Sequence, residues 1–157
     1  MENRIQFDFR EVDTACLLSL RHQVLRTGLP IESACFPGDD EPSTRHFALF
    51  INESPDQRAE QVIGCASFML NEWEGERAWQ LRGMAIDTRY QNRGLGRNLL
   101  TAAEKAITKE SPIRLFWCNA RLPAVSFYEA QGWTIASDIF IIPDAGPHRR
   151  MTKRLPP

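Results

Sequence analysis

A glycine-containing turn between an apolar segment and an amphipathic helix constrains this chain more than any other feature. The apolar segment ends at Ile86, and residues 91–96 follow with the sequence Gln-Asn-Arg-Gly-Leu-Gly. The helical pattern places apolar residues on one face, namely Leu95, Leu99, Leu100, Ala103 and Ile107. Glycines before a helix let the backbone turn sharply, and the unpaired N–H groups of the first helical turn attract anions. With Arg93 and Arg97 beside those amides, residues 84–101 are predicted to hold a phosphate.

The spacing of the glycines excludes two familiar phosphate-binding motifs. The dinucleotide fingerprint Gly-x-Gly-x-x-Gly would need a third glycine where this chain has Leu99, and the Gly-Lys-Ser/Thr of a Walker loop is absent. A Gly-x-Gly pair alone is also compatible with a plain strand-to-helix turn, in which glycine only relieves backbone strain. The choice between a phosphate loop and a plain turn therefore depends on the rest of the chain.

Length and composition are those of one ordinary globular domain over residues 1–157. Hydrophobic residues make up 43% of the chain and charged residues 25%. No apolar run approaches the ~20 residues that a membrane-spanning helix needs, and early acidic residues argue against a secretion signal. The four cysteines lie far apart without Cys-x-x-Cys spacing, so we expect reduced thiols in a cytoplasmic protein, with no metal site and no disulfide framework.

The net charge of −1 argues against nucleic acid as a partner, but the charge is uneven along the chain. Residues 77–97 contain five arginines and one aspartate, a local charge of +4, which suits a multiply anionic cofactor. Residues 28–41 contain four acids and no basic residue, a local charge of −4, which suits a cationic partner. Plain solvated surface is the alternative for both segments, and for the acidic one it is the favoured interpretation.

The apolar periodicity predicts strands and helices in an order typical of a mixed α/β sheet. Alternation at Ile5, Phe7 and Phe9 predicts a first strand with one buried face, and a helical period then runs from Val12 to about Gly28. Residues 28–44 form a long connection, of a kind that is often functional. The remaining predicted elements are strands over residues 46–51 and 62–70 joined as a hairpin by a turn at 52–61, a strand over 78–86, a helix over 95–109, a strand over 113–118, a helix over 124–131 that ends at Gly132, and strands over 133–142 and 148–155.

A second motif lies in the last third of the chain, where residues 119–133 read Asn-Ala-Arg-Leu-Pro-Ala-Val-Ser-Phe-Tyr-Glu-Ala-Gln-Gly-Trp. Together with Gln91-x-x-Gly94-x-Gly96, this segment resembles the GNAT superfamily of acyl-CoA-dependent N-acyltransferases, whose later motif is Ala-x-x-Phe-Tyr-Glu-x-x-Gly-Phe. Trp133 stands in place of the more usual phenylalanine, an aromatic change that should keep the packing. The alternative for the second motif alone is an amphipathic helix with a core tyrosine. The resemblance covers nearly the whole chain, strongly over residues 81–132 and loosely before Arg45.

The resemblance implies a GNAT-like fold, in which helices flank a central mixed sheet whose middle strands splay apart at their ends. In the family, the pantetheine arm of coenzyme A lies in that gap and pairs with the backbone of the strand before the loop. The loop amides then bind the pyrophosphate. The implied acetyl-CoA contacts are therefore the strand end (Met84, Ala85, Ile86), the loop (Gln91, Asn92, Arg93, Gly94, Leu95, Gly96, Arg97) and two wall residues (Asn119, Phe127).

The reaction that the resemblance implies is direct attack of a neutral amine on the thioester in a ternary complex. The leaving thiolate benefits from a proton donor, and the family places a tyrosine near the sulfur, so Tyr128 is the predicted catalytic residue. A lysine-like amine has a pKa of ~10.4, and deprotonating it at neutral pH costs about 4–5 kcal/mol, so a base should help. Some family members carry a glutamate as base on the strand before the loop, but the matching residue here is Gln80, which cannot take a proton. Other candidate bases, among which the sequence does not choose, are His46, Glu32, Glu72 and His148.

Two other function classes stay open at this point. A domain of this kind that binds acyl-CoA without turnover would act as a sensor or assembly module; the intact Tyr128 argues against it and the missing glutamate for it. A nucleotide-binding module would explain the loop but not the segment around Tyr128. The acceptor is predicted to be a small-molecule or peptide amine, with a cationic small amine favoured because residues 28–41 lie where the family frames the acceptor pocket. The oligomeric state is open, with a dimer as one option.

Overall fold

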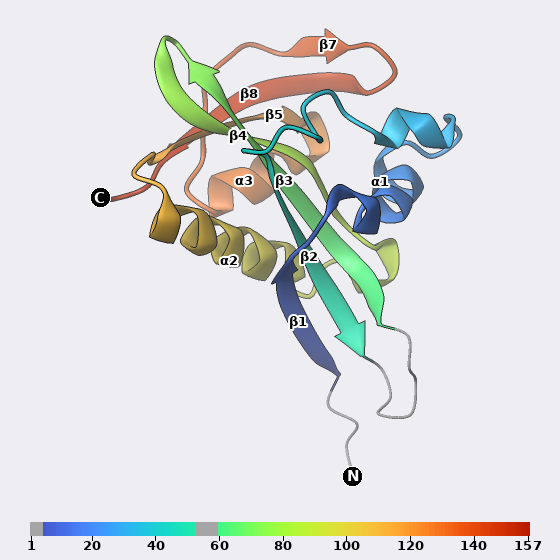
Figure 1. Cartoon of the computed structure of the whole chain (residues 1–157). Helices are drawn as coiled ribbons and strands as arrows, with labels where there is room; N and C mark the ends of the chain where they lie inside the picture. The colour runs from blue at the N-terminus through green and yellow to red at the C-terminus, as the bar shows by residue number, and fades with distance from the viewer. Residues whose placement is uncertain (1–4, 53–59) are drawn as a thin grey trace. The chain divides into compact units, whose positions relative to one another are not determined.

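The computed structural model describes residues 5–52 and 60–157 as a mixed sheet with helices (Figure 1). In chain order the elements are β1 (Gln6–Glu11), η1 (Thr14–Cys16), α1 (Leu18–Leu25), η2 (Ile31–Ala34), β2 (Arg45–Asn52), β3 (Gln61–Trp73), β4 (Glu76–Ile86), η3 (Thr88–Tyr90), α2 (Leu95–Glu110), β5 (Leu115–Arg121), η4 (Leu122–Ala124), α3 (Val125–Ala130), β6 (Thr134–Ile135), β7 (Phe140–Ile142) and β8 (Gly146–Arg154), where η denotes a 3₁₀ helix. The strand order is β1-β2-β3-β4-β5-β8-β6, and β7 pairs with β8. The predicted α/β class with a mixed sheet is confirmed.

The chain divides into two compact units, which are described separately. The first unit consists of Met1–Ser67 and Gly83–Ala106, and the second consists of Phe68–Arg82 and Ile107–Pro157. The boundaries fall inside β3, β4 and α2, so each of these elements contributes residues to both units.

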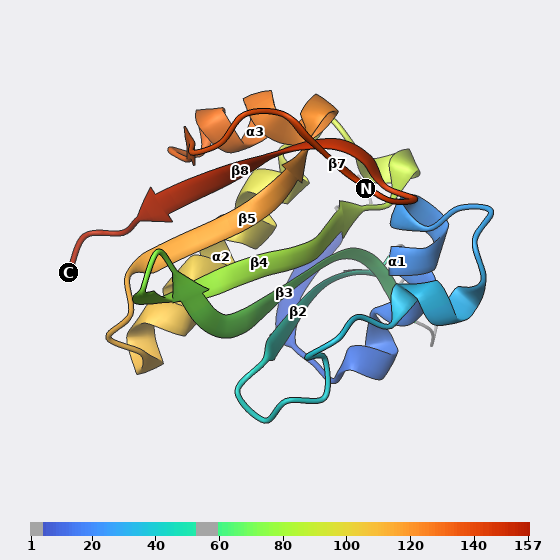
Figure 2. The same cartoon turned by 90° about the horizontal axis from the view of Figure 1, so that it is seen from above.

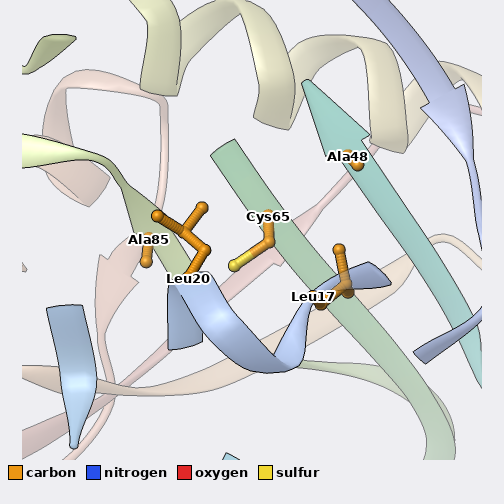
Figure 3. Packing of buried hydrophobic residues seen from close by; sticks show 5 residues of the cluster. All are labelled: Leu17, Leu20, Ala48, Cys65 and Ala85. Carbon is orange, nitrogen blue, oxygen red and sulfur yellow. The ribbon is translucent and has the colours of Figure 1, made fainter. Parts of the chain in front are cut away.

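In the first unit, α1 packs on the inner strands through small side chains. Figure 3 shows the cluster, which consists of Leu17, Leu20, Ala48, Cys65 and Ala85. Every member is at most 5% exposed. Small residues on β2, β3 and β4 let the two leucines approach the sheet closely, and burying each leucine stabilises the fold by about 1.5–3 kcal/mol. This packing fixes the last residues of β4, where the predicted site begins.

A buried ion pair anchors the long connection before β2 to α1. Arg21 is fully buried, and its guanidinium donates to both carboxylate oxygens of Asp39, at 2.7 and 3.1 Å. It also donates to the Ala34 carbonyl at 3.0 Å and to Ser67 Oγ at 2.7 Å. Burial alone would raise the pKa of Asp39, but the Arg21 hydrogen bonds, the Phe36 amide and the Arg21 charge outweigh it, so that pKa is lowered. One acid of residues 28–41 is therefore not solvated surface.

Asp39→Ala is expected to lower the free energy of unfolding by about 3–5 kcal/mol, because it leaves the buried Arg21 charge without its carboxylate. The exposed neighbour Asp40 is the matched control, and Asp40→Ala should change stability by no more than about 0.5 kcal/mol. Urea unfolding at neutral pH measures both values, and equal losses in the two variants would contradict this role for the ion pair.

The same pair predicts a pH dependence. Because the pKa of Asp39 is lowered in the folded state, its stabilisation is fully present above the unfolded-state pKa of about 4. It is lost as the pH falls through the lower folded-state value. The stability difference between the wild type and Asp39→Ala should therefore shrink in acid.

Gly83 has a left-handed backbone inside β4, next to this ion pair. Its φ is +59°, and a glycine with positive φ inside a strand is typical of a β-bulge. A Cβ at this position would lie 2.7 Å from the Phe36 ring and 2.9 Å from Arg21 Nε. Both the backbone conformation and the available space therefore require glycine here.

The second unit is built on the long antiparallel pairing of β5 and β8, which lie side by side in Figure 2. The register runs from Leu115 opposite Arg154 to Arg121 opposite His148. β4 pairs with β5 in parallel, and the joined residues are Trp79 with Phe116, Gln80 with Trp117, and Leu81 with Cys118. α3 ends at Ala130, and the predicted stop residue Gly132 follows with a φ of +88° and an amide that donates to the Glu129 carbonyl at 3.0 Å.

Three local predictions are wrong. The single strand predicted over residues 133–142 is two short strands. Between them the Ser137 side chain takes a backbone hydrogen bond of the neighbouring strand β8, since its Oγ accepts the Arg150 amide at 2.8 Å. The helix predicted from Val12 begins only at Leu18, after η1. In η1 the Thr14 hydroxyl lies 2.9 Å from His46 Nε2, which ties this segment to β2.

The third error concerns the predicted buried face of β1. Ile5 and Phe7 are 44% and 40% exposed, whereas Phe9 stacks on Phe47 with ring centroids 5.4 Å apart. Among the described residues, β1 is an edge strand of the sheet and pairs with only one neighbour, β2. The turn predicted over residues 52–61 lies mostly outside the described residues.

Candidate functional site

The turn between β4 and α2 is held by side chains at both ends. Asp87, only 1% exposed, accepts the Arg89 amide at 3.0 Å and the Arg89 guanidinium at 3.2 and 3.0 Å. These hydrogen bonds and the Arg89 charge lower the pKa of Asp87 despite burial. The Asp87 amide donates to the Ile63 carbonyl of β3 at 2.7 Å, and Gln91 Nε2 donates to the Ile86 carbonyl at 2.9 Å. The predicted phosphate loop therefore starts from a fixed strand end.

Two residues with left-handed backbone carry the chain from this turn into α2. Asn92 has φ +62° and Gly94 has φ +77°, a region that asparagine and glycine adopt most readily. α2 begins at Leu95, and the Asn98 amide donates to the Gly94 carbonyl at 3.1 Å. The amides of residues 95–97 precede this first helical hydrogen bond, so they have no partner within the helix.

Exposed arginines lie on both sides of these amides. Arg93 and Arg97 are exposed, and the Arg93 guanidinium lies 5.5 Å from the centroid of the Tyr90 ring. A Cβ at Gly94 would meet nothing within 4 Å, so the loop surface is open at this point. Backbone amides, a helix N-terminus and guanidinium groups are together able to bind a phosphate or pyrophosphate.

The strand end before the loop combines buried and half-buried side chains. Ala85 is 5% exposed and packs in the α1 cluster, while Met84 and Ile86 are half-buried. The register of β4 with β5 reaches Leu81, and β4 itself continues to Ile86. The first unit thus contains ten of the predicted cofactor residues, namely Met84, Ala85, Ile86, Gln91, Asn92, Arg93, Gly94, Leu95, Gly96 and Arg97.

The other predicted site residues, Tyr128, Phe127 and Asn119, lie in the second unit. Tyr128 is 8% exposed, and its ring packs edge-on against Phe127 and Trp133 at centroid distances of 5.1 and 5.5 Å. Burial, with a smaller effect from Cys118, raises the pKa of Tyr128 well above that of an ordinary tyrosine, so the phenol keeps its proton at neutral pH.

Asn119 carries an unsatisfied acceptor. Its Oδ1 is buried and has no hydrogen-bond partner within residues 5–52 and 60–157. Leaving a buried carbonyl unpaired costs about 1–3 kcal/mol. A bound ligand with an N–H group would remove that cost.

The candidate bases lie in different surroundings. His46 is 5% exposed; its Nδ1 lies 2.6 Å from Ser67 Oγ and its Nε2 lies 3.0 Å from the Asp39 carbonyl. Because a carbonyl only accepts, Nε2 carries the proton, and both ring nitrogens are engaged in the fold. His148 is 4% exposed, with Nδ1 2.7 Å from the Gly146 carbonyl. The remaining candidates, Glu32 and Glu72, are exposed on η2 and β3, and Gln80 accepts a hydrogen bond through its side-chain oxygen.

An open acidic cavity of about 630 Å³ lies in the first unit. Its lining includes the end of the acidic segment and the start of the chain after β1, namely Glu11, Val12, Asp13, Thr14, Ala15, Asp39, Asp40, Glu41, Pro42, Thr44 and His46. Glu11 binds Arg45 at 2.9 and 2.8 Å, and Asp39 binds Arg21. Asp13, Asp40 and Glu41 supply the rest of the negative charge.

Two residues that matter for the site were not identified from the sequence. Arg21 lies one helical turn after Leu17 and three residues before Val24, so its place on the apolar face of α1 was a readable signal of burial. Cys118, beside Tyr128, gave no signal in its spacing. Burial raises the pKa of Cys118 and of Cys65 to about 12, so both thiols are protonated at neutral pH.

Within the described ranges, no group of three or more His, Cys, Asp or Glu residues gathers as a metal site. In the same residues, no helix combines the length and the apolar character needed to cross a membrane. All four cysteines carry free thiols.

Comparison with known proteins gives a consistent family. A family model described as "Acetyltransferase (GNAT) domain" matches residues 44–135. A curated Bacillus subtilis (strain 168) protein named as an acetyltransferase is 36% identical over 75 residues, which are 48% of this chain and 50% of that protein. The match thus spans about half the length of that curated relative.

Solved structures share the fold. An N-acetyltransferase structure from Lactobacillus plantarum is similar with a TM-score of 0.71 at 22% identity, covering 98% of this chain and 99% of that one. A structure of aminoglycoside 6′-N-acetyltransferase complexed with coenzyme A has a TM-score of 0.70 at 14% identity, covering 96% and 98%. At these identities the likeness extends to the fold alone.

Proposed function

The chain belongs to the acetyltransferase (GNAT) family, and from this premise we propose that it transfers an acetyl group from acetyl-CoA to a primary amine. The observation that carries the proposal is the loop at Gly94, which lies inside the matched residues and leads with positive φ into the amides at the start of α2 that have no partner within the helix. Such a helix start suits a diphosphate such as the one in coenzyme A. We also propose that residues 1–157 act as a single GNAT-like domain in the cytoplasm.

The acyl donor in this proposal is held mainly by main-chain groups. Met84, Ala85 and Ile86 pair with the pantetheine arm as an added strand would. The amides of residues 93–97 bind the pyrophosphate, and Gln91 and Asn92 shape the turn; the hydrogen bond from Gln91 to the Ile86 carbonyl supports this role. Asn119 and Phe127 contact the arm or nucleotide, and the unpaired Asn119 Oδ1 suits an amide N–H of the arm.

Tyr128 is the proposed proton donor to the leaving thiolate. The raised pKa keeps the phenol protonated over the whole range in which a thiolate with a pKa near 8.5 forms, so the proton is present when the thiolate leaves. A buried phenol also meets little competition from water for its hydrogen-bond acceptor.

Direct attack of the amine is favoured over an acyl-cysteine intermediate. The nucleophilic form of cysteine is the thiolate, and Cys118, whose charge affects Tyr128, stays a protonated thiol because burial raises its pKa to about 12. In the proposed step, the neutral amine nitrogen forms a bond to the acetyl carbonyl carbon, the carbon–sulfur bond breaks, and the sulfur takes a proton from Tyr128. The proton lost by the amine nitrogen goes to water or to the phenolate, and we assign no residue as the base.

The acceptor in this proposal is a primary amine of a small molecule or a peptide. The cationic small amine predicted from residues 28–41 stays a prediction. Asp39 and Glu11 are already neutralised by arginines, so the charge that supports it comes from Asp13, Asp40 and Glu41.

Thiol release from acetyl-CoA, measured with a panel of primary amines, tests the proposed function. Release should require an amine, and acetyl-CoA alone should give no burst, because no acyl-enzyme forms. Coenzyme A binding without turnover for any amine would instead support the acyl-CoA sensor or assembly module. Tight binding of nucleoside triphosphates with no binding of coenzyme A would support the nucleotide-binding module.

A further inference from the structure

Three side chains on β3, β4 and β5 form a hydrogen-bonded chain in the second unit. Trp117 Nε1 donates to Asn71 Oδ1 at 2.8 Å, and Asn71 Nδ2 donates to Gln80 Oε1 at 2.7 Å. The ring of Trp73 packs against that of Trp117 at a tilt, with the ring centroids 5.3 Å apart.

The donors and acceptors in this row of hydrogen bonds are fixed by the indole of Trp117. An indole N–H can only donate, so the Asn71 atom that faces Trp117 must be its oxygen. The Asn71 nitrogen then faces Gln80, which must present its own oxygen in return. The amide orientations of Asn71 and Gln80 are therefore fixed by a donor-only residue, which removes the usual ambiguity of amide groups.

This orientation leaves the nitrogen of the Gln80 amide, Nε2, as the atom that can bind a ligand. The Gln80 oxygen is engaged, so Nε2 with two N–H donors is the end that remains. Gln80 is 9% exposed, and the hydrogen bond from Asn71 uses only its oxygen. Nε2 is nevertheless not one of the fully buried side-chain atoms that lack a partner among the described residues. Nε2 therefore keeps contact with solvent while the rest of the side chain is enclosed.

We propose that Gln80 determines acceptor specificity, with Nε2 donating to a carbonyl or carboxylate oxygen next to the reacting amine. The proposal rests on the proposed function. It narrows the acceptor to amines that carry a carbonyl group nearby, such as an amino acid, an amino amide or a peptide. A fixed N–H donor also disfavours a second ammonium group, so polyamines are poor acceptors.

Two observations favour the acceptor as the ligand of Nε2. Gln80 lies on β4, the strand whose end at residues 84–86 is assigned to the acyl donor, and it precedes that end. Trp117 is the register partner of Gln80 on β5, and the ring of Trp73 packs against that of Trp117, so two half-buried indoles offer apolar surface suited to the carbon skeleton of an acceptor. The rival source of a carbonyl oxygen is the acetyl thioester itself, and the test separates the two.

Two substitutions replace the outward N–H donor at residue 80 with an outward oxygen acceptor, each in a different way. Gln80→Glu accepts the same hydrogen bond from Asn71 and presents an oxygen outward. Asn71→Asp still accepts from Trp117 but offers Gln80 a second oxygen, so the Gln80 amide turns over, Nε2 points inward and Oε1 points outward. Gln23→Glu, an exposed change on α1, adds the same charge and is the matched control.

The kinetic test uses pairs of amines that differ only in the carbonyl group: phenylalaninamide with phenethylamine, and lysine with cadaverine. The wild type should prefer the carbonyl-bearing member of each pair in kcat/KM. Gln80→Glu and Asn71→Asp should each reduce that preference by about tenfold, while Gln23→Glu leaves it unchanged. Dividing the preference of each variant by the preference of the wild type cancels the difference in intrinsic reactivity between the two amines of a pair. An equal fall in kcat for both members would assign Nε2 to the thioester and overturn the proposal, as would an unchanged preference.

A second readout does not depend on turnover. In NMR spectra of the protein with coenzyme A, phenylalaninamide should shift the Gln80 side-chain amide signals in the wild type, whereas phenethylamine should not. In Asn71→Asp those amide protons should exchange more slowly with water, while the Trp117 indole signal persists. Gln80 protons already protected in the free wild type would overturn the proposal. Absence of turnover with every amine would count against the proposed function, and the amide shifts would still decide the role of Gln80.

Discussion

Replacing Gly94 with valine is expected to weaken coenzyme A binding on the order of 100-fold. The φ of +77° is a conformation that costs a residue with a Cβ about 1–2 kcal/mol, so the loop must change shape. The amides of residues 95–97 then lose their common direction, and each contact between an anion and the helix start is worth ~0.3–2 kcal/mol. Isothermal titration with coenzyme A measures the effect.

Gly75 provides a matched control for the Gly94 variant. It has φ +81°, and a Cβ there would also meet nothing within 4 Å, but it lies in the turn between β3 and β4. Gly75→Val should therefore lose a similar amount of stability while keeping its affinity for coenzyme A. Equal affinity in Gly94→Val and the wild type would show that the loop is a plain strand-to-helix turn.

Tyr128→Phe is expected to lower kcat by about 100-fold, with little change in the dissociation constant for coenzyme A. The substitution keeps the ring that packs between Phe127 and Trp133 and removes only the proton donor. Steady-state kinetics with the best amine of the panel and calorimetry with coenzyme A measure the two quantities separately.

The pH profile adds a second check on Tyr128. Because the pKa of Tyr128 is raised, its proton is present up to at least pH ~10, so the wild-type kcat should show no loss from tyrosine ionisation below that pH. A purely structural tyrosine would instead give a Tyr128→Phe variant with lower thermal stability and an unchanged kcat.

Local patterns predicted the elements near the loop well. The strand expected over residues 78–86 is β4 (Glu76–Ile86), and the helix expected over residues 95–109 is α2 (Leu95–Glu110). In both cases the apolar period is long, and turn-forming residues mark where the element stops. The positive φ of Gly94 follows from the same reasoning, since a sharp turn before a helix needs a residue without a Cβ.

Long-range contacts explain what the sequence did not predict. The acidic segment looked like solvated surface, but Asp39 is held by Arg21, a contact between residues that no local pattern connects. The split of residues 133–142 into β6 and β7 depends on hydrogen bonds from β8 to Ser137. The chain from Trp117 through Asn71 to Gln80 likewise joins three strands, so the position that matches the family glutamate could be identified but its partner could not.

In the proposed function, the bonds that hold Asp87 and Gln91 make the loop at Gly94 a preorganised receptor for the pyrophosphate. Ordering the backbone of a flexible loop costs about 1–2 kcal/mol per residue. Here the Asp87 amide is tied to Ile63, and Gln91 is tied to Ile86, so this entropy is lost when the chain folds and not when a ligand arrives. In that proposal, the loop binds the pyrophosphate without rearrangement, and a substitution that frees Asp87 or Gln91 should weaken binding through entropy.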